Sequence, residues 1–425
     1  MMKQIEGSQG IAEAVALCRP QVVCAYPITP QTHIVEGVSA MVKTGALQNC
    51  EFINVESEFA ALSVAIGASA VGARAYTATA SQGLLFMAEA VYNAAGLGLP
   101  IVMTVGNRAI GAPINIWNDH SDSMALKDAG WIQLYAETNQ EALDLHIQAF
   151  RLAEDLSCPV MVCVDGFILT HAFERLEIPT QAQVDAFLPP FEPVQQLDAD
   201  NPYSIGAMVG PEAFTEVRYL GHQKQIEALE VIPRIAAEFE AAFGRASGGL
   251  VRPYRIEDAE TVVVALGSVN GTIKDVVDAE RDAGVRIGSI AITSFRPFPL
   301  AELHDFLAGA TRVVCVEKSL APGLGGTLAS NVRMALRGIA KPVYTVIAGL
   351  GGRPITRASL ADVFHLAAAD ALEDVTFLDL NHEVIAQQMA IAERERHSGP
   401  IAENLLKALN PGLSRSGPQD EGTGP

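Results

Sequence analysis

The proline-containing segment YPITP, at residues 26–30, constrains the fold of this chain more than any other segment. It follows the apolar run 22–25, which has the length and composition of a buried strand. Its two prolines cannot donate to a sheet ladder and disfavour a helix before them, so the strand must end here. Thr29 is therefore left beyond the carboxyl end of a strand, where open α/β sheets bind their ligands. An ordinary proline-rich turn would have the same sequence, so the segments that follow must decide between the two interpretations.

Short apolar runs alternate with amphipathic segments over residues 1–175. The expected strands are 22–25, 51–55, 75–79, 101–105, 132–135 and 159–164. Such alternation is typical of a parallel sheet that is covered by helices on both faces. A second unit of the same kind follows in residues 256–385. Its expected strands are 261–266, 286–292, 312–317 and 343–347. We therefore predict an α/β protein with two doubly wound domains.

The segment between the two domains, residues 176–255, has a different composition. Prolines punctuate its polar first half, and a helical pattern over 222–243 contains Pro233. We expect an extended linker or arm that lies on another surface and adds no core, with its helix kinked or interrupted at the proline. Residues 386–425 are expected to form a helical tail with a disordered end, because the last dozen residues are polar and rich in Gly and Pro.

Composition limits the partners and the compartment. A net charge of −20 argues against binding to nucleic acid or to an anionic membrane, since both need basic patches. The six cysteines form no CxxC pair, so we expect reduced thiols and no iron–sulfur cluster on this chain. We find neither the apolar core of a signal peptide nor an uninterrupted apolar stretch of membrane-spanning length. These features predict a cytoplasmic protein without membrane insertion.

Seven segments together give the chain a family resemblance. They are YPITP at 26–30, Ser57-Glu58 before a helix of small residues, TASQGL at 79–84, NRA at 107–109 with NIWNDHSD at 115–122, DGF…TH at 165–171, FRPFP at 295–299 and LGGR at 350–353. Each is weakly specific, but their order is that of the α subunit of the 2-oxoacid:ferredoxin oxidoreductases. The chain resembles this family, closest to the pyruvate:ferredoxin or pyruvate synthase type, over about residues 5–385.

The resemblance implies a fold and a reaction. Residues 1–175 would be the pyrimidine-type domain of a thiamine diphosphate enzyme, and residues 256–385 a domain like the C-terminal domain of transketolase. The reaction would be the coenzyme A-dependent oxidative decarboxylation of a 2-oxoacid, most simply pyruvate, to acyl-CoA and CO2, with electrons passed to ferredoxin. Aryl, branched-chain and other substrates such as phenylglyoxylate, 2-oxoisovalerate and oxalate remain alternatives. So does a catalytically silent scaffold subunit.

Two glutamates compete for a role beside thiamine diphosphate. This cofactor is activated when a carboxyl group hydrogen-bonds N1′ of its aminopyrimidine ring, and both Glu56 and Glu58 follow the expected strand 51–55. A glutamate at a helix start can also be a simple dipole partner. The family pattern of Ser-Glu before a small-residue helix implies that Glu58 is the catalytic and cofactor-binding residue, and Glu56 is the alternative.

The resemblance also implies a clamp for the substrate carboxylate. Arg108 matches the arginine of the family's NRA segment, and a guanidinium is a permanently charged, two-pronged donor for a carboxylate. Thr29 matches the threonine of YPITP and would add a hydroxyl donor. Both are expected to be catalytic and substrate-binding. An isolated arginine at a loop start can equally be a surface residue.

The loop 111–122 carries the remaining polar candidates. Asp119, His120 and Asp122 have no standard metal-ligand spacing, so we expect no metal site on this chain and a structural hydrogen bond for His120. Ile114, Ile116 and Trp117 of this loop are candidates for bounding the substrate side chain. The glycine-rich loop 321–327 is equally consistent with a tight turn and is assigned no ligand.

The sequence lacks the Gly-Asp-Gly motif with which thiamine diphosphate enzymes hold the metal of the diphosphate. The resemblance therefore implies that the cofactor is shared with a β-type, diphosphate-binding subunit that holds Mg²⁺. It places the [4Fe-4S] clusters on ferredoxin-like subunits of the γ and δ types and the coenzyme A site elsewhere. The chain would be active only with these partner subunits and with ferredoxin or another acceptor.

Overall fold

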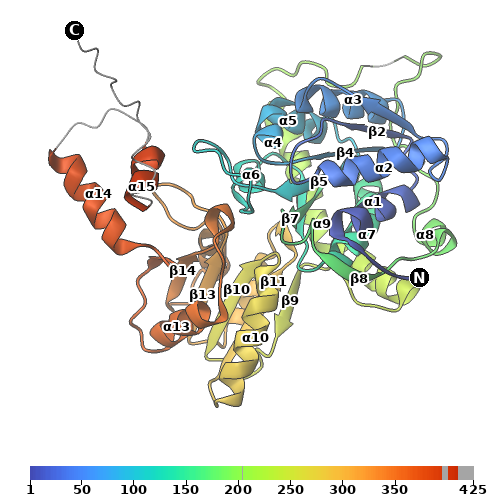
Figure 1. Cartoon of the computed structure of the whole chain (residues 1–425). Coiled ribbons are helices and arrows are strands. Elements are labelled where there is room, and N and C mark those ends of the chain that lie inside the picture. Colours follow the sequence, from blue (N-terminus) through green and yellow to red (C-terminus); the bar gives the residue numbers. More distant parts are fainter. Residues whose placement is uncertain (203, 395–400, 410–425) are drawn as a thin grey trace, which may run out of the picture. The chain divides into compact units, whose positions relative to one another are not determined.

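The computed structural model describes residues 1–202, 204–394 and 401–409. The chain divides into two compact units, Met1–Thr376 and Phe377–Pro425 (Figure 1). The second unit contributes helices α14 (His382–Arg394) and α15 (Ile401–Leu409). The disordered end expected at the C-terminus falls on residues 414–425, which lie outside the described residues.

The first sheet of the larger unit has seven strands in the order β12-β6-β7-β5-β4-β2-β3. Their bounds are β2 Val22–Ala25, β3 Glu51–Asn54, β4 Ala75–Thr79, β5 Val102–Asn107, β6 Ile132–Tyr135, β7 Val160–Asp165 and β12 Ser294–Arg296. The six expected strands are confirmed to within two residues and are all parallel. The seventh, β12, was not expected as a strand and comes from the later half of the chain. It pairs antiparallel with β6.

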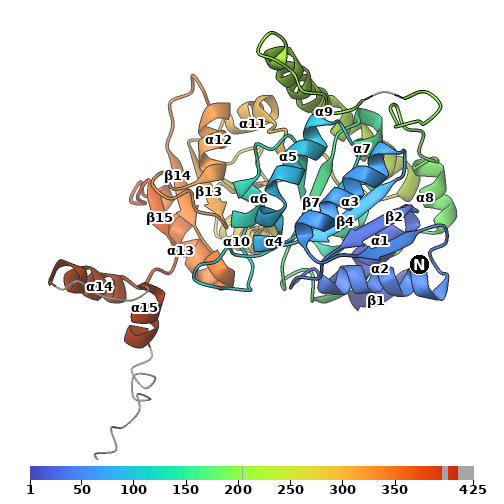
Figure 2. The same ribbon diagram turned by 90° about the horizontal axis from the view of Figure 1, so that it is seen from above.

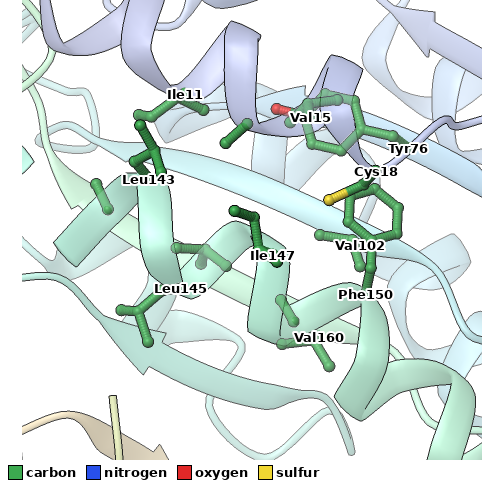
Figure 3. Packing of buried hydrophobic residues seen from close by; sticks show 14 of the residues in the cluster. Ile11, Val15, Cys18, Tyr76, Val102, Leu143, Leu145, Ile147, Phe150 and Val160 are labelled. Atoms are coloured by element: carbon green, nitrogen blue, oxygen red, sulfur yellow. The ribbon is translucent and has the colours of Figure 1, made fainter. Parts of the chain in front are cut away.

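Helices cover both faces of this sheet, as expected (Figure 2). One core cluster contains residues of α1 (Gly7–Leu17), α2 (Thr32–Thr44) and α7 (Asn139–Leu156) together with the strands. Figure 3 shows part of it, with Ile11 and Val15 of α1 near Ile147 and Phe150 of α7. The other cluster contains α3 (Glu58–Ala70), α4 (Ser81–Phe86) and α5 (Ala88–Gly96).

The second sheet follows the order β15-β14-β13-β10-β11-β9. Its strands are β9 Val251–Tyr254, β10 Thr261–Leu266, β11 Ile287–Ile292, β13 Arg312–Glu317, β14 Val343–Ile347 and β15 Val375–Phe377. Its helices are α10 Val269–Asp282, α11 Leu300–Leu307, α12 Thr327–Ala335 and α13 Arg357–Ala368. The four expected strands are parallel, and β9 adds an antiparallel edge. The prediction of two α/β sheets is confirmed.

The core of this second sheet is continuous with that of the first. Ile290 and Val264 belong to the same cluster as Leu84 and Trp131. The six cysteines lie buried and unpaired in these cores, as expected. Burial raises the pKa of Cys24 and Cys50 to about 11, which keeps these thiols protonated and unreactive at neutral pH.

The expectation for residues 176–255 is wrong in part, because this segment contributes to the core. Helix α8 (Gln181–Phe187) begins with a capping box between Thr180 and Gln183, and α9 (Phe214–Phe243) runs uninterrupted through Pro233. The buried side of α9 belongs to the first core cluster; its members are Ala228, Ile232, Ile235, Phe239 and Phe243. Their spacing of three and four residues is the amphipathic helical pattern, which the high proline content of the segment obscured. Packing of this face compensates for the hydrogen bond that the proline removes.

Two further strands were not expected. β1 (Met2–Glu6) and β8 (Phe173–Glu177) form a separate antiparallel pair. Across the described parts of the chain, every helix is either too short or too polar to cross a bilayer.

The core role of α9 can be tested with two aromatic residues of this helix. Phe239 is fully buried between the rings of Phe187 and Phe243, whereas Tyr219 is 59% exposed. We expect Phe239→Ala to lower the free energy of unfolding by about 3–5 kcal/mol, because it leaves a cavity, and Tyr219→Ala to change it by less than about 0.5 kcal/mol. Denaturant unfolding of both variants measures the difference. Equal losses in the free energy of unfolding for the two variants would mean that α9 lies on the surface and does not contribute to the core.

Candidate active site

Five functional segments meet at one edge of the first sheet. The carboxyl ends of parallel strands lie at the same edge, and β7, β5, β4, β2 and β3 are neighbours in that order. The chain leaves β2 toward β3 on one side and leaves β4 toward β5 on the other. The edge between β2 and β4 is thus a topological switch point, where α/β sheets bind ligands. Thr29 follows β2, Glu58 follows β3 and Arg108 follows β5.

Glu58 is the first residue of α3 and is buried, with 8% of its surface exposed. The helix start is capped by the side chain of Ser57, which accepts a hydrogen bond from the Ala60 amide. The carboxyl group of Glu58 is therefore not needed as a cap, and it has no hydrogen-bond partner within the described part of the chain. Glu56, by contrast, is exposed. A buried carboxyl group without a partner is costly unless a bound molecule supplies one.

Gly83 makes room for this carboxyl group. A Cβ at this position would lie 2.7 Å from Glu58 Oε1 and 2.6 Å from Thr79 Oγ1. Any side chain at residue 83 would therefore push Glu58 away from its present position. The TASQGL turn and the helix of small residues form one unit around Glu58.

Arg108 is buried just beyond β5. Its guanidinium donates to two main-chain carbonyls, from Nη1 to Thr29 at 3.0 Å and from Nε to Asn115 at 3.2 Å. No carboxylate pairs with this guanidinium among the described residues. Burial lowers the pKa of Arg108, against the opposing effect of Asp122, but a guanidinium stays charged at any physiological pH. The positive charge is therefore free for an anionic ligand.

Asp122 connects Arg108 to the turn that carries Gly83. One carboxylate oxygen, Oδ2, accepts from the amide of Ser81 at 2.8 Å and from the amide of Arg108 at 3.0 Å. The other, Oδ1, accepts from the Asn107 side chain and the Ser123 amide, both at 2.8 Å. Burial raises the pKa of Asp122 to about 6, although these hydrogen bonds oppose the rise. This residue positions the site, a role that the sequence analysis did not assign to it.

The three residues expected to be catalytic all follow strands at this edge. The main chain at Thr29 contacts Arg108 directly, and the side chain of Thr29 is exposed. Glu58 makes no hydrogen bond to either of them among the described residues, and its carboxyl group lies against Gly83.

The loop 111–122 is fixed at its ends and exposed in its middle. Ile114, Ile116 and Trp117 are exposed, so they are available to a ligand or a partner but enclose nothing on this chain alone. Asn115 donates to the carbonyl of Gly351 at 3.2 Å. The LGGR segment of the second sheet thus lies against this loop.

His120 is a buried structural residue, as expected. Its Nε2 lies 2.6 Å from Oδ1 of Asp165, which ends β7. The other oxygen of Asp165 accepts from Nζ of Lys318 at 2.6 Å, and from the amide of Ser268 at 2.9 Å and its hydroxyl. Burial alone would raise the pKa of Asp165, but Lys318 and His120 outweigh it and hold the pKa well below the ordinary value. Lys318 and Ser268 belong to the second sheet, so this buried ion pair joins the two sheets.

The glycine-rich loop 321–327 is occupied by the protein's own carboxylate. Glu317 accepts from the amides of Leu328 at 2.7 Å and Ala329 at 3.0 Å, at the start of α12. Gly326 is required here, because a Cβ would lie 1.8 Å from Glu317 Oε1. Burial raises the pKa of Glu317 to about 7, while its hydrogen bonds to these amides oppose the rise.

Comparison with known families identifies the family to which this chain belongs. Residues 13–237 match the pyruvate flavodoxin/ferredoxin oxidoreductase family in its thiamine diphosphate-binding part, and residues 259–360 match the pyruvate:ferredoxin oxidoreductase core domain II. The chain belongs to the pyruvate flavodoxin/ferredoxin oxidoreductase family. The resemblance drawn from the ordered motifs is confirmed.

Individual proteins of this family are similar over most of the chain. Pyruvate synthase subunit PorA of Methanosarcina barkeri is 46% identical over 393 residues, which cover 90% of this chain and 98% of PorA. Ketoisovalerate oxidoreductase subunit VorA of Pyrococcus abyssi is 40% identical over 357 residues, covering 83% and 90%.

A solved structure has a similar fold. It is the 2-oxoglutarate:ferredoxin oxidoreductase of Magnetococcus marinus with 2-oxoglutarate, coenzyme A and succinyl-CoA bound. The TM-score is 0.64 at 18% identity, and the match covers 88% of this chain and 65% of that chain. At this identity the likeness shows the fold alone.

Thiamine diphosphate, the cofactor of the matched family, fits the residues at the sheet edge in one respect. The unpartnered carboxyl group of Glu58 can bind a ring nitrogen of this family's cofactor, while the exposed Glu56 lies outside the buried turn. Sequence reasoning quoted Gly83, Asp122 and Asp165 within the family-like segments but gave them no supporting role, and it did not single out Lys318. Asp165 ends an apolar strand at the functional edge, and that position could have marked it.

The ion pair between the two sheets of this oxidoreductase chain yields a prediction. Asp165→Asn leaves the charge of Lys318 buried without a counterion, so we expect a loss of about 3–5 kcal/mol in the free energy of unfolding. Asp305 makes a surface pair with His304 and is 83% exposed. Asp305→Asn, as the control, should cost no more than about 1 kcal/mol. Equal losses in chemical denaturation would contradict the structural role of Asp165.

Proposed function

We propose that this chain is the α-type subunit of a pyruvate synthase. With its partner subunits it catalyses the coenzyme A-dependent oxidative decarboxylation of pyruvate to acetyl-CoA and CO2, and passes the electrons to ferredoxin. The 46% identity to a pyruvate synthase subunit over nearly its full length supports this function. The observation that carries it is a pair of opposite charges at one sheet edge that have no oppositely charged partner among the described residues, the carboxyl group of Glu58 and the guanidinium of Arg108.

Each residue has one role in the proposed site. Thiamine diphosphate, when bound, supplies the nucleophilic carbon and the electron sink for decarboxylation. Glu58 would hold its aminopyrimidine ring by a hydrogen bond to N1′. Arg108 binds the carboxylate of the 2-oxoacid by charge-assisted hydrogen bonds. Thr29 adds a hydroxyl donor at the same carboxylate.

The main-chain contact of Arg108 with Thr29 supports the proposal that both residues bind the substrate carboxylate. Because the guanidinium already donates to the carbonyl of Thr29, the two residues can approach one substrate group from adjacent positions. Asp122 keeps the main chain of Arg108 fixed relative to the turn at Ser81. The clamp is therefore preorganised before a substrate arrives.

The remaining parts of the enzyme lie on other chains in this proposal. The absence of a Gly-Asp-Gly sequence supports a β-type subunit that binds the diphosphate and Mg²⁺. The absence of paired cysteines supports [4Fe-4S] clusters on γ- and δ-type, ferredoxin-like subunits. The acceptor is ferredoxin or a similar carrier, and the complex is cytoplasmic.

Within this chain we assign residues 1–175 to the thiamine and substrate domain, 176–255 to a connecting segment, 256–385 to the second domain and 386–425 to the tail.

A branched-chain 2-oxoacid is the second candidate substrate. The 40% identity to a ketoisovalerate oxidoreductase subunit favours it, since Arg108 and Thr29 would bind the carboxylate of either acid. The side chain of the substrate must then be selected by other groups, such as the exposed Ile114 and Ile116 or the partner chain. Viologen reduction by the complete complex with pyruvate, 2-oxoisovalerate and phenylglyoxylate separates the candidates. A higher kcat/KM for 2-oxoisovalerate than for pyruvate would identify the branched-chain acid as the substrate.

The first prediction for this site concerns Glu58. Glu58→Gln should abolish turnover of the assembled complex without changing its assembly, because an amide cannot exchange a proton with the ring nitrogen. Glu56→Gln should keep near-normal turnover, because Glu56 is exposed. Viologen reduction and size-exclusion chromatography measure the two properties. Normal turnover in Glu58→Gln would mean that another residue binds the aminopyrimidine ring, or that the chain is a catalytically silent scaffold.

A second pair of variants tests the position of Glu58 without changing it. Gly83→Ala should also reduce turnover strongly, because the added Cβ displaces the Glu58 carboxyl group. Gly67 lies in the same helix as Glu58, and a Cβ there would meet nothing within 4 Å. Gly67→Ala is therefore the matched control and should be active. If both variants behave alike, the close contact at Gly83 does not position the carboxyl group.

The second prediction concerns the clamp. Arg108→Ala should lower kcat/KM at least tenfold for every 2-oxoacid of the panel, because a desolvated charged hydrogen bond contributes roughly 2–5 kcal/mol. The comparison across substrates is the decisive measurement. A loss confined to one substrate would identify Arg108 as a reader of the side chain.

A further inference from the structure

Two histidines and a glutamate that have no role in the candidate active site lie close together. Glu6 ends β1, His33 lies in the first turn of α2 and His171 precedes β8. One possible ligand atom from each lies within 4.8 Å of the other two. Throughout the described ranges, no other three His, Cys, Asp or Glu residues come together in this way.

The main chain holds two of these residues side by side. β1 and β8 pair antiparallel with Glu6 opposite Phe173, two residues after His171. The amide of Gly7 donates to the carbonyl of Ala172, and the amide of Ser8 to that of Thr170, both at 2.9 Å. The main-chain hydrogen bonds around the β1–β8 pair therefore fix the positions of Glu6 and His171, independently of any contact between their side chains.

His33 is brought to this pair by close packing of two helices. A Cβ at Gly37 would lie 2.9 Å from Cβ of Ala12, so α2 rests tightly on α1. In this position His33 Nδ1 lies 2.7 Å from Oε1 of Glu6. The rings of His33 and His171 have centroids 4.8 Å apart.

The donor set has a defined metal preference. Two imidazoles and one carboxylate are the protein ligands of many zinc sites that keep a fourth position open, and imidazole also suits Co²⁺ and Ni²⁺. The hydroxyl of Thr170 lies 2.8 Å from Nδ1 of His171. The same Nδ1 lies 4.0 Å from Oε1 of Glu6, so it is the ring nitrogen that faces the cluster, and a bound ion would take the place of its contact with the Thr170 hydroxyl. We propose that Glu6, His33 and His171 form a binding site for a divalent transition-metal ion, with zinc as the best match.

The site is connected to the loop beside the proposed active site. The Phe167 ring lies 4.6 Å from the ring of His171 and 4.6 Å from that of Trp117, measured between centroids. A metal that fixes His171 therefore also orders the rings against which loop 111–122 packs. The ion would act on this loop through packing and would not touch the substrate.

Cobalt binding tests the proposal on the full chain, without an affinity tag and after treatment with a chelator. Titration with Co²⁺ should give the visible absorption bands of a tetrahedral or five-coordinate site with nitrogen ligands, and Zn²⁺ should displace it. His33→Ala and His171→Ala should each weaken binding at least tenfold, and Glu6→Gln should weaken it as well. No bands in the unaltered chain would overturn the proposal. So would bands that persist in both histidine variants.

A matched control comes from the second sheet. His365 Nε2 lies 2.9 Å from Oε2 of Glu280, a histidine–glutamate pair without a second imidazole. His365→Ala should leave the cobalt spectrum and the affinity unchanged; a loss equal to that of His33→Ala would mean that any surface pair binds the ion. The side chain of His33 is 49% exposed, so its removal should not unfold the chain. An unchanged melting curve of the metal-free His33→Ala variant, measured beside the titration, shows that its loss of binding is local.

Discussion

The buried carboxylate of Asp165 is the interaction on which the arrangement of the two sheets depends. It ends a strand of the first sheet and binds a lysine and a serine that follow strands of the second. A fully buried charge is tolerated only when its counterion and hydrogen bonds are all present. The relative position of the two sheets is therefore specified within narrow limits. A second ion cluster, in which Arg252 and Lys274 meet Glu137, lies at the same junction and adds to this specification.

The proposed active site has the opposite character, because its charges are left without partners. Among the described residues, the guanidinium of the buried Arg108 donates only to carbonyl oxygens, and the carboxyl group of Glu58 has no hydrogen-bond partner. Both arrangements weaken the isolated chain, and both become favourable once ligands and a partner chain complete them. Proteins depart from local rules mainly where they bind. Asp165, whose carboxylate is fully paired, and Glu58, whose carboxyl group is proposed to bind the cofactor, are thus in opposite environments.

Much of this fold was predictable, and the failures have specific causes. Each central strand is a short apolar run between turn residues, so its position could be read from the sequence. Strands β1 and β8 were missed because they are short, half polar and far apart in sequence, with Glu6 opposite Phe173 as their nearest pair. Helix α9 was missed as part of the core because prolines nearby hid its apolar spacing. Thr29 was expected beyond the end of a strand, and the family resemblance implied that Arg108 acts on the same carboxylate. The contact of Asp165 with Lys318, 153 residues later, depends on how two domains pack, and no local pattern encodes that.

The short strand β12 has a consequence for biosynthesis. It closes the edge of the first sheet beside β6, yet it consists of residues 294–296. During translation the first sheet therefore keeps an unpaired edge until more than two thirds of the chain has left the ribosome, and unpaired edges invite wrong pairing. The two halves also share a hydrophobic core. Cutting the chain in the connecting segment would therefore yield two pieces with incomplete cores. If evolution exchanged the second half for another domain, the new domain would have to supply a strand in place of β12.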